Sequence, residues 1–453
     1  MTALVGAAEC ARRIRAGILS PREAVEQYLE RIEALNGEIN AYIAVRGDEA
    51  LAEAEHVPDG PLRGVPVGIK DVIDVAGVAT TAASRVLDGD IATRDAVSVE
   101  RLRQAGAIVL GKLNTHEFAF GASTTSAHFG PAHNPWALDR ICGGSSGGSG
   151  AAAAADLASG ALGTDTAGSI RIPACFCGVT GLRPTTGLVS TAGVVPVSWT
   201  LDAVGPIARS AEDCAVLLSA LTGQPYDLVE GVRSLRVGVV DALFEQADPA
   251  VAAQVTAAVE ELAGLGATVE KIEVPLLEES GTINQLLMLP EAAEVHLPWL
   301  RTRLGEYGDD VRARLLAGLL LPATAHVTGL RATRWFRDEL RKVFDRVDLL
   351  SAPEMPIAAP RIGENEVEIQ GQRLLYRLSL IPYNSPWSLA GLPVASVPAG
   401  FVDGLPVGLA LVGRVRDEAT LLGAARTFQG ATGWHGRRPP AEIHAAAPAV
   451  RKT

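Results

Sequence analysis

The chain has 453 residues and a formal net charge of −12, and 48% of its residues are hydrophobic. This composition is typical of a globular protein with a substantial core. It excludes a nucleic-acid-binding surface, which needs clustered lysine and arginine to displace the counterions of the phosphate backbone. No stretch approaches the roughly 18 consecutive apolar residues of a membrane-spanning helix, so no membrane association is expected.

The N-terminal part of the chain alternates helix and strand signals. Helices are predicted between residues 5 and 36, where Ser20, Pro21 and Glu23 form a capping box and Asn36–Gly37 predicts the end of the second helix. The apolar run "LRGVPVGIKDVIDVAG" then predicts a buried strand with Lys70 near its end. Residues 98–114 predict another helix followed by a strand, and this alternation is typical of an α/β sheet.

A glycine-rich segment, "GGSSGGSG" at residues 143–150, runs directly into the alanine-rich residues 151–155. It lacks the G-x-G-x-x-G order of a dinucleotide-binding turn and the lysine of a nucleoside-triphosphate loop. A flexible linker would separate two periodic segments, so the pattern favours a fixed turn at the start of a helix. The residues that follow, 160–187, combine many Gly, Thr and Ser with few charges and predict a buried, irregular core segment.

The second half of the chain continues the alternation. A helix is predicted over residues 206–223, a strand within 234–244 and a helix within 248–269. Residues 281–345 are rich in helix signals, and their apolar runs predict packing in the core or in a homodimer, with the lining of an apolar cleft as the alternative. The tail, residues 439–453, is predicted to be flexible.

The five cysteines are few and widely spaced, which argues against a disulfide framework and favours a reducing compartment such as the cytoplasm. Cys175 and Cys177 flank a single phenylalanine and have no second cysteine pair or histidine cluster nearby to complete a metal site. His116 in "HEFAF" lacks the second histidine of an H-E-x-x-H motif. We therefore expect packed thiols, no metal and no cofactor.

Two arrangements could activate a serine nucleophile. Residues 144–148 satisfy the G-x-S-x-G motif of α/β-hydrolase esterases with Ser146 at its centre, and His435 is the remaining candidate for its base. The preceding "DRIC" does not predict the strand that this motif requires. The second arrangement combines Lys70, Ser145 and Ser169, because a lysine kept neutral by desolvation can remove the proton of a serine hydroxyl.

The segments "GGSSGGSG" and "GTDTAGSIRIPACFCGVTGLRPT" together resemble the signature region of the amidase signature family of serine hydrolases. The segment around Lys70 and the block "LAGLPVASVPAG" are similar to further parts of the family, so the resemblance covers about residues 8 to 437. It implies an α/β fold with a large mixed, mostly parallel central β-sheet flanked by helices on both faces. It also implies one catalytic domain over 1–438, with a signature core at 62–225 and a variable substrate-cleft region at 281–385.

Carried over position by position, the resemblance implies the roles of the catalytic residues. Ser169 would be the nucleophile, Lys70 the base, and Ser145, preceded by a cis peptide bond, the residue that relays the proton between them. Ser146 would hydrogen-bond to Lys70 and orient it. The mechanism implied is acyl transfer in two steps through an acyl-enzyme.

The resemblance also implies an oxyanion hole made of the backbone amides of Thr166, Ala167 and Gly168. Ala167 departs from the family pattern, in which glycine is commoner, and we expect the hole to survive because its donors are main-chain groups. Cys142 stands where proline often precedes the glycine-rich loop. A slightly different entry of the chain into that loop is therefore expected.

The substrate is expected to be a small-molecule amide. The resemblance places Ala119, Phe120 and Gly121 near the acyl pocket. The apolar residues of 281–385 favour an uncharged aliphatic or aryl amide, and they include Leu286, Leu287, Met288, Trp299, Leu374, Leu375 and Tyr376. The same machinery would also accept an ester or a carbamate. One alternative is the glutamine-hydrolysing A subunit of the aminoacyl-tRNA amidotransferase, although such subunits tend to carry glutamine where this chain has Ile172. An inactive scaffold is disfavoured, because every proposed catalytic position is filled.

Overall fold

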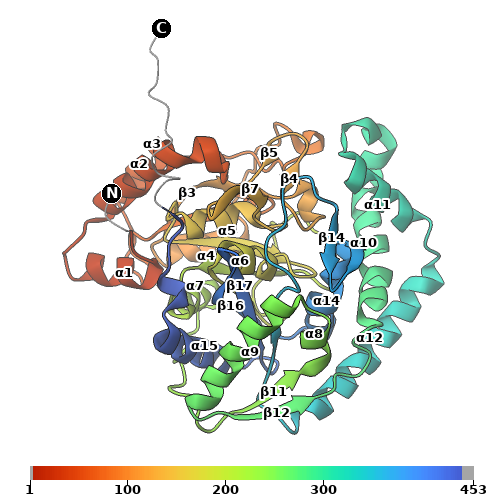
Figure 1. Cartoon of the computed structure of the whole chain (residues 1–453). Helices are drawn as coiled ribbons and strands as arrows, with labels where there is room; N and C mark the ends of the chain where they lie inside the picture. The colour runs from red at the N-terminus through yellow and green to blue at the C-terminus, as the bar shows by residue number, and fades with distance from the viewer. Residues whose placement is uncertain (1–3, 441–453) are drawn as a thin grey trace.

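The computed structural model describes residues 4–440, and most of the tail that was predicted to be flexible lies outside them (Figure 1). An eleven-stranded mixed sheet passes through the middle of the molecule in the order β1-β3-β2-β8-β10-β9-β16-β17-β13-β11-β12. Its strands are β1 (Tyr42–Val45), β2 (Pro66–Lys70), β3 (Ile108–Leu113), β8 (Gly160–Asp165), β9 (Thr180–Arg183), β10 (Ala203–Ala208), β11 (Arg236–Val240), β12 (Thr268–Ile272), β13 (Leu349–Pro353), β16 (Val394–Val402) and β17 (Leu405–Val412).

Helices flank this sheet, and three two-stranded sheets lie outside it. The helices are α1 (Ala7–Arg15), α2 (Pro21–Ile39), α3 (Gly47–Ala54), α4 (Val97–Gln104), α5 (Gly147–Ala154), α6 (Arg171–Cys177), α7 (Ala211–Thr222), α8 (Asp241–Glu245), α9 (Pro249–Gly264), α10 (Ser280–Thr302), α11 (Asp309–Leu319), α12 (Ala323–Phe344), α13 (Tyr376–Ser379), α14 (Ile381–Ala390) and α15 (Glu418–Thr432). The small sheets pair β4 (Thr125–Ser126) with β5 (Gly130–Pro131), β6 (His133–Asn134) with β7 (Ala137–Ile141), and β14 (Glu366–Ile369) with β15 (Gln372–Leu375).

The large mixed sheet flanked by helices confirms the predicted fold class, but the expectation of a mostly parallel sheet is wrong. Four strand pairs of the main sheet are parallel, and they lie toward its two ends. Six pairs are antiparallel. One reason is that β16 and β17 are joined by the two-residue turn Asp403–Gly404, where both residues have positive φ, so no crossover helix separates them.

The N-terminal helices follow their sequence signals closely. The Ser20 hydroxyl accepts from the Glu23 amide while the Glu23 carboxylate accepts from the Ser20 amide, which confirms the predicted capping box. The predicted end at Asn36–Gly37 is too early, because α2 continues to Ile39, a fully buried side chain in the core. Asn40 then ends the helix in the left-handed conformation.

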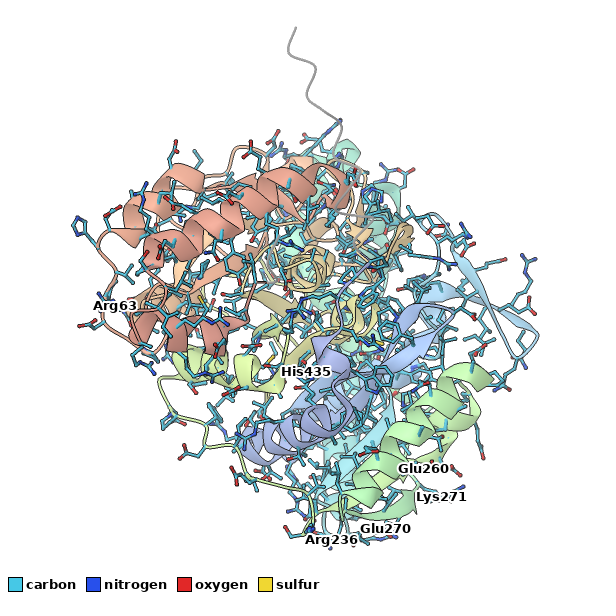
Figure 2. All side chains as sticks on the ribbon, turned by 60° about the vertical axis from the view of Figure 1, so that its left-hand side comes forward. Arg63, Arg236, Glu260, Glu270, Lys271 and His435 are labelled. Atoms are coloured by element: carbon cyan, nitrogen blue, oxygen red, sulfur yellow. The ribbon has the colours of Figure 1, made fainter. Side chains whose placement is uncertain are left out.

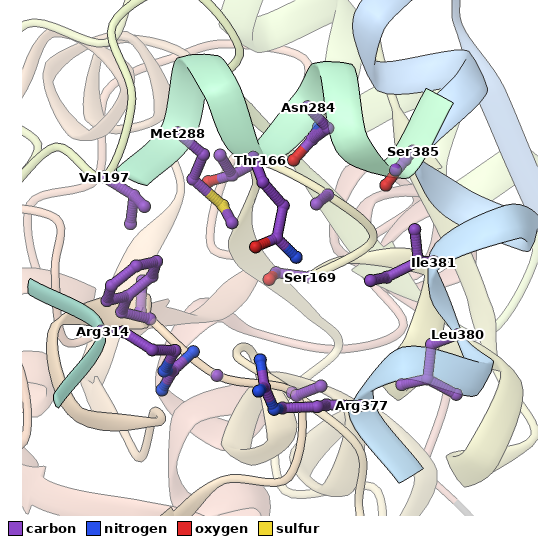
Figure 3. A pocket seen from close by; sticks show the side chains of 18 of the residues that line it. Thr166, Ser169, Val197, Asn284, Met288, Arg314, Arg377, Leu380, Ile381 and Ser385 are labelled. Carbon is purple, nitrogen blue, oxygen red and sulfur yellow. The ribbon is translucent and has the colours of Figure 1, made fainter. Parts of the chain in front are cut away.

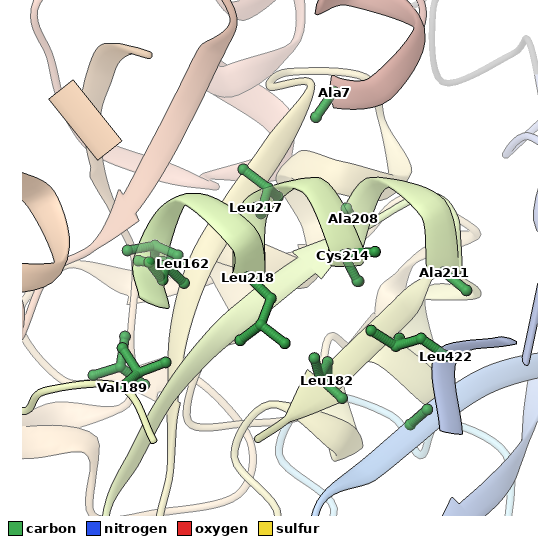
Figure 4. Close-up of a cluster of buried hydrophobic side chains, with 14 of the residues drawn as sticks. Ala7, Leu162, Leu182, Val189, Ala208, Ala211, Cys214, Leu217, Leu218 and Leu422 are labelled. Atoms are coloured by element: carbon green, nitrogen blue, oxygen red, sulfur yellow. The ribbon is translucent and has the colours of Figure 1, made fainter. Parts of the chain in front are cut away.

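The core lies between the sheet and the helices that cover it. The strands β2, β3 and β8 are buried along their whole length, as expected where helices shield both faces of a sheet. Helix α7 turns Leu217 and Leu218 toward the cluster that includes Leu162 and Leu182 of the neighbouring strands (Figure 4). The helix predicted over residues 206–223 begins only at α7, because residues 206–208 belong to β10 and pair with β8.

The segment 160–187 is buried as predicted, but the expectation that it is irregular is wrong. It contains β8, α6 and β9 in succession. Its glycines serve close packing: a Cβ on Gly181 would lie 2.6 Å from Ala174 Cβ, and one on Gly163 would lie 2.8 Å from Ser146 Oγ. Small side chains therefore mark a tight contact between strands and helices in this segment, where the sequence predicted irregular structure.

Helices α10, α11 and α12 form a layer at one side of the molecule, away from α1–α3 (Figure 1). The prediction that residues 281–345 are rich in helix is confirmed. Within the described residues no single helix is long and apolar enough to span a membrane, and only the pair α11 and α12, bent by 94°, passes such a test together. All five cysteines are buried and free, which confirms the packed thiols.

The outer strand β12 carries charges that suit an edge position. Lys271 pairs with Asp241, and Glu270 pairs with Arg346. Figure 2 shows Glu270 and Lys271 at the same end of the molecule as Arg236 of the adjacent β11. Charged side chains on an edge strand disfavour pairing with another chain.

Candidate active site

Lys70 is the last residue of β2 and is fully buried. Its Nζ donates to Ser145 Oγ at 2.7 Å and to Thr164 Oγ1 at 2.7 Å. Burial lowers the pKa of the Lys70 amine to about 7, although the nearby carboxylates of Asp165 and Asp202 partly oppose this shift. The structure thus brings two of the predicted catalytic side chains into contact. Because the pKa of the Lys70 amine is about 7, a large fraction of this amine is neutral near pH 7.

The loop that carries Ser145 is held from several directions. The Gly144–Ser145 peptide bond is cis, as the resemblance implied. The Ser145 carbonyl accepts from Thr115 Oγ1 and Thr124 Oγ1, both at 3.0 Å, and from the His116 amide at 3.1 Å. The predicted fixed turn is therefore confirmed.

The glycines of this loop are needed because other backbone segments lie against it. A Cβ on Gly144 would lie 2.6 Å from the amide nitrogen of Ser123, and one on Gly148 would lie 2.5 Å from the amide nitrogen of Asn114. Both contacts are with backbone, which cannot move aside as a flexible side chain can. The glycine-rich composition of this loop thus reflects the close approach of neighbouring backbone segments to it.

Within the described residues no hydrogen bond links Ser146 to Lys70, so the predicted hydrogen bond between them is wrong. The Ser146 hydroxyl donates to the Thr164 carbonyl at 3.2 Å and accepts from the Thr164 amide at 3.3 Å. The Thr164 hydroxyl takes the expected place beside Lys70, because β8 lies next to β2 in the sheet and presents that side chain to the amine. Sequence reasoning missed Thr164, although it lies within the signature segment.

The esterase alternative that uses Ser146 finds little support in this geometry. The expectation that no strand precedes the motif is wrong, because residues 137–141 form β7. Ser146 itself is fully buried at the start of α5, with its hydroxyl bonded to backbone. A nucleophile in that motif has to be exposed at the tip of a turn, which Ser146 is not.

Ser169 lies between β8 and α6 and is half-buried in the wall of a pocket (Figure 3). Ala119, Phe120 and Gly121 line the same pocket, where the resemblance placed them. The Ser169 carbonyl accepts from the Ser146 amide at 3.2 Å, which joins the nucleophile turn to the glycine-rich loop. Within residues 4–440 no hydrogen bond links the hydroxyl of Ser169 to that of Ser145.

The turn before Ser169 is built around the buried carboxylate of Asp165. That carboxylate accepts from the amides of Gly168 and Ile170 at 2.9 and 3.1 Å, and from two nitrogens of Arg171 at 3.0 Å each. Arg183 donates to it at 3.1 Å. Burial alone would raise the pKa of Asp165, but the charges of Arg171 and Arg183 outweigh burial and hold that pKa below its usual range.

One of the three backbone amides predicted for the oxyanion hole is not available, so the prediction is wrong at that position. The amide of Gly168 points to Asp165, so Gly168 does not supply a free donor. It supplies instead a backbone with φ of +117°, which glycine adopts without steric cost. The amides of Thr166 and Ala167, whose residues line the pocket, have no hydrogen-bond acceptor in the described chain. Ala167 is not among the described residues with positive φ, so alanine fits there.

The pocket has two chemically different sides. Apolar side chains from α10 and α14, from Leu380 just before α14 and from the loop before β10 face it, and these include Met288 and Ile381. On the other side Arg314 of α11 and Arg377 of α13 lie below Ser169 in Figure 3. Sequence reasoning missed both arginines, because nothing local distinguishes them from neighbours such as Arg312 and Arg373 that do not line the pocket.

The variable region contributes to the pocket as expected, but through few of the expected residues. Met288 lines the pocket, whereas Leu287 is buried in a separate core cluster and Leu374 and Leu375 are exposed on β15. Tyr376 is buried and donates to the Ala122 carbonyl at 2.8 Å. In the described part of the chain no group of three or more His, Cys, Asp or Glu side chains could hold a metal ion.

Comparison with known proteins identifies the family. A family model described as Amidase matches residues 23–422. The A subunit of the glutamyl-tRNA(Gln) amidotransferase from Methanosarcina acetivorans is 39% identical over 466 residues, which cover 93% of this chain and 96% of that protein. A bacterial aryl acylamidase of the amidase signature family aligns with a TM-score of 0.87 and 25% identity, over 98% of this chain and 99% of its own.

Another solved structure is described as part of a vestigial protein complex that reveals the evolutionary origins of an s-triazine catabolic enzyme. It aligns with a TM-score of 0.91 and 36% identity over 94% of this chain and 99% of that chain. The matches extend over nearly the whole chain in both sequence and structure. The chain therefore belongs to the amidase signature family.

Replacing Asp165 by alanine should destabilise the protein strongly. The change leaves Arg171 and Arg183 buried without their shared counter-ion, which costs about 3–5 kcal/mol in the free energy of unfolding. Urea denaturation of the purified variant measures this loss. Asp59→Ala is the control, because that side chain is 92% exposed and its removal should change stability by less than about 0.5 kcal/mol. Equal stability of the two variants would contradict the role assigned to Asp165.

Proposed function

We propose that the chain hydrolyses the carbon–nitrogen bond of a small amide through an acyl-enzyme on Ser169. The observation that carries this proposal is the contact of the buried Lys70 amine with Ser145 Oγ, in a loop whose next amide binds the carbonyl of Ser169. A nucleophile, a base of lowered pKa and a pocket thus meet at one place. Membership of the amidase signature family supports the same reaction class.

The proposed proton path starts from the contact between Lys70 and Ser145. The neutral amine of Lys70 takes the proton of the Ser145 hydroxyl, and Ser145 Oγ takes the proton of Ser169. Ser169 Oγ then bonds to the amide carbon, and the carbonyl oxygen becomes an oxyanion. When the carbon–nitrogen bond breaks, Lys70 returns the proton through Ser145 Oγ to the departing nitrogen, because Ser169 Oγ is now bonded to the acyl carbon. Water attacks the acyl-enzyme in the second half of the reaction and releases the acid.

The oxyanion would be bound by the backbone amides of Thr166 and Ala167. Both residues line the pocket beside Ser169, and a donor of this kind contributes about 3 kcal/mol to transition-state stabilisation. Asp165 fixes the turn that presents these amides, since it binds the Gly168 and Ile170 amides from the opposite side. Thr164 holds the Lys70 amine in place while Ser145 exchanges its proton.

A second candidate is hydrolysis of glutamine as the A subunit of an aminoacyl-tRNA amidotransferase. Relatives of that name match 93–95% of this chain at 36–39% identity, which favours this reading on sequence alone. The pocket differs in one respect, because Ile172 lines it where such subunits tend to carry glutamine. Esters and carbamates are further candidate substrates of the same machinery, since each presents a carbonyl carbon to Ser169.

The variants Lys70→Ala and Ser169→Ala should both lose turnover, with kcat lowered by about 10³-fold or more, because one lacks the base and the other the nucleophile. Ser145→Ala should leave a small residual activity, since water can replace the relaying hydroxyl. Initial rates on a panel of anilide, fatty amide, dipeptide amide and carbamate measure these effects.

Ser149→Ala is the matched control for these variants. This serine is also buried in the glycine-rich loop, but its hydroxyl donates to the Leu162 carbonyl and not to Lys70. Its activity should stay within about threefold of wild type. A Lys70→Ala enzyme of near-native activity would end the proposed mechanism.

The value of kcat/KM should rise roughly tenfold between pH 6 and pH 8 and then level off, because Lys70, with a pKa of about 7, must lose its proton to act as base. Rates at constant ionic strength measure the profile. Burial raises the pKa of Asp202, which bonds to Thr166, to about 6. The variant Asp202→Asn should keep an inflection but move it to lower pH, because it removes one of the carboxylates that raise the pKa of Lys70; an inflection caused by Asp202 itself would instead disappear. Rates that are flat or fall between pH 6 and pH 8 would contradict the assignment of Lys70 as base.

The two candidate functions differ in their need for partner chains. As a stand-alone amidase, the purified chain should hydrolyse at least one amide of the panel, and added amidotransferase partner subunits should leave the rate unchanged. If it instead works within an amidotransferase complex, it should release ammonia from L-glutamine only when those partners are present. An ammonia-release assay with and without the partners decides between the two outcomes.

A further inference from the structure

We propose that the substrate carries a carboxylate, which Arg314 and Arg377 bind while the amide carbonyl lies at Ser169. The two guanidinium groups are on one side of the pocket that contains Ser169 (Figure 3). This inference rests on the proposed amide hydrolysis and adds to it the chemical class of the substrate. It replaces the expectation of an uncharged substrate, which was based on the apolar residues of the variable region.

Arg314 is oriented by groups on two sides. Its guanidinium carbon lies 4.4 Å from the centre of the Phe120 ring, and its Nη2 donates to Asp310 Oδ2 at 2.9 Å. Its Nε donates to the Asp310 carbonyl at 3.2 Å. No partner is found for its Nη1 within residues 4–440, so one edge of the guanidinium is available to an oxygen ligand.

The first turn of α11 is fixed against the wall of the pocket. Asp310 Oδ2 lies 3.1 Å from His116 Nε2, and the amide of Gly308 donates to Glu117 Oε2 at 2.8 Å. His116 and Glu117 closely precede the pocket residues 119–121. Asp310 is therefore a positioning residue, because it holds Arg314 in register with the segment beside Ser169.

Arg377 provides a second positive charge without a carboxylate of its own. Its side chain is exposed at the pocket, and the described residues offer it neither an ion pair nor a hydrogen bond. Burial lowers the pKa of Arg314, and the charge of Arg377 lowers it further, against the opposing effect of Asp310. A carboxylate placed at both guanidinium groups would relieve this repulsion and accept bidentate hydrogen bonds.

The positive charge is local and not part of a basic surface. The whole chain carries a net charge of −12, and of the described residues that line the pocket only Arg314 and Arg377 are charged. Among these described lining residues there is no aspartate or glutamate, so the ammonium group of a free amino acid would enter without a counter-ion. We therefore expect a mono-anionic amide to bind better than L-glutamine, which has the same carboxylate plus an ammonium group.

The opposite wall offers a neutral polar group. Asn284 of α10 lines the pocket with only 2% of its surface exposed, and its side-chain nitrogen has no hydrogen-bond partner in the described chain. A buried donor without a partner is costly unless a ligand satisfies it. The side-chain nitrogen of Asn284 can donate a hydrogen bond to the carbonyl oxygen of an amide, but it cannot pair with a cationic group of the substrate.

The test compares matched pairs of substrates. The monoamides of succinic, glutaric and adipic acid are each paired with the unbranched amide in which a methyl group replaces the carboxylate, so that no chain length is assumed. With the wild-type enzyme, kcat/KM should be about 10- to 100-fold higher for the best acid monoamide than for its uncharged partner. L-Glutamine should be a poorer substrate than glutaric acid monoamide.

The variants Arg314→Gln and Arg377→Gln should raise KM for the acid monoamide about tenfold or more, and should raise KM for the uncharged amide much less, so that the preference for the acid monoamide falls about tenfold. Arg373→Gln is the matched control, because Arg373 is on the neighbouring strand β15 with a side chain 79% exposed and does not line the pocket. Its KM should equal that of wild type. Asp310→Asn should raise KM less than Arg314→Gln does, because it only loosens the orientation of Arg314.

Two readouts separate this inference from the proposed function. Labelling of Ser169 by a fluorophosphonate, located by mass spectrometry, tests the nucleophile without any choice of substrate. Binding of the acid monoamide to Ser169→Ala, measured by calorimetry, tests the carboxylate site without turnover and should be lost in the double variant Ser169→Ala/Arg377→Gln. Equal rates on charged and uncharged amides, equal effects of Arg377→Gln on both, or a preference for L-glutamine would each overturn the inference.

Discussion

The site depends on one desolvated amine. Lys70 is fully buried at the end of a central strand, and burial brings its pKa down to about 7. A lysine side chain in water would stay protonated at neutral pH and could not act as base. The surroundings of Lys70 favour the neutral amine instead. The sheet excludes water from the amine, Thr164 and Ser145 satisfy it with hydroxyl groups, and the glycine-rich loop allows Ser145 to reach it.

The nearby charges must support the nucleophile turn without reprotonating Lys70. Asp165 is close enough to raise the pKa of the amine, and its carboxylate is at the same time paired with Arg171 and Arg183. The same carboxylate accepts the amides of Gly168 and Ile170 and so shapes the turn on which Ser169 lies. One buried ionic cluster thus links the electrostatics of the base to the geometry of the nucleophile.

The pocket is lined by Ser169 and by residues from distant parts of the chain. The reacting groups come from β2, the loop before α5 and the turn after β8, whereas the walls come largely from α10, α11, α13 and α14. Two arginines on these walls point to an anionic substrate, and the apolar side chains opposite them favour a short aliphatic or aryl body. The residues to which we assign the reaction and those to which we assign the choice of substrate therefore come from separate parts of the fold.

Local features could be predicted from the sequence because neighbouring residues determine them. These include the capping box at Ser20, the strand that ends at Lys70 and the fixed glycine-rich turn before α5. Contacts between distant segments required the tertiary structure: the antiparallel centre of the sheet, the bonding of Ser146 to Thr164 and the use of the Gly168 amide by Asp165. Arg314 and Arg377 reach the same pocket only because the variable helices pack over the signature core. Backbone preferences and hydrophobic periodicity act over a few residues, whereas the packing of whole elements decides which side chains meet.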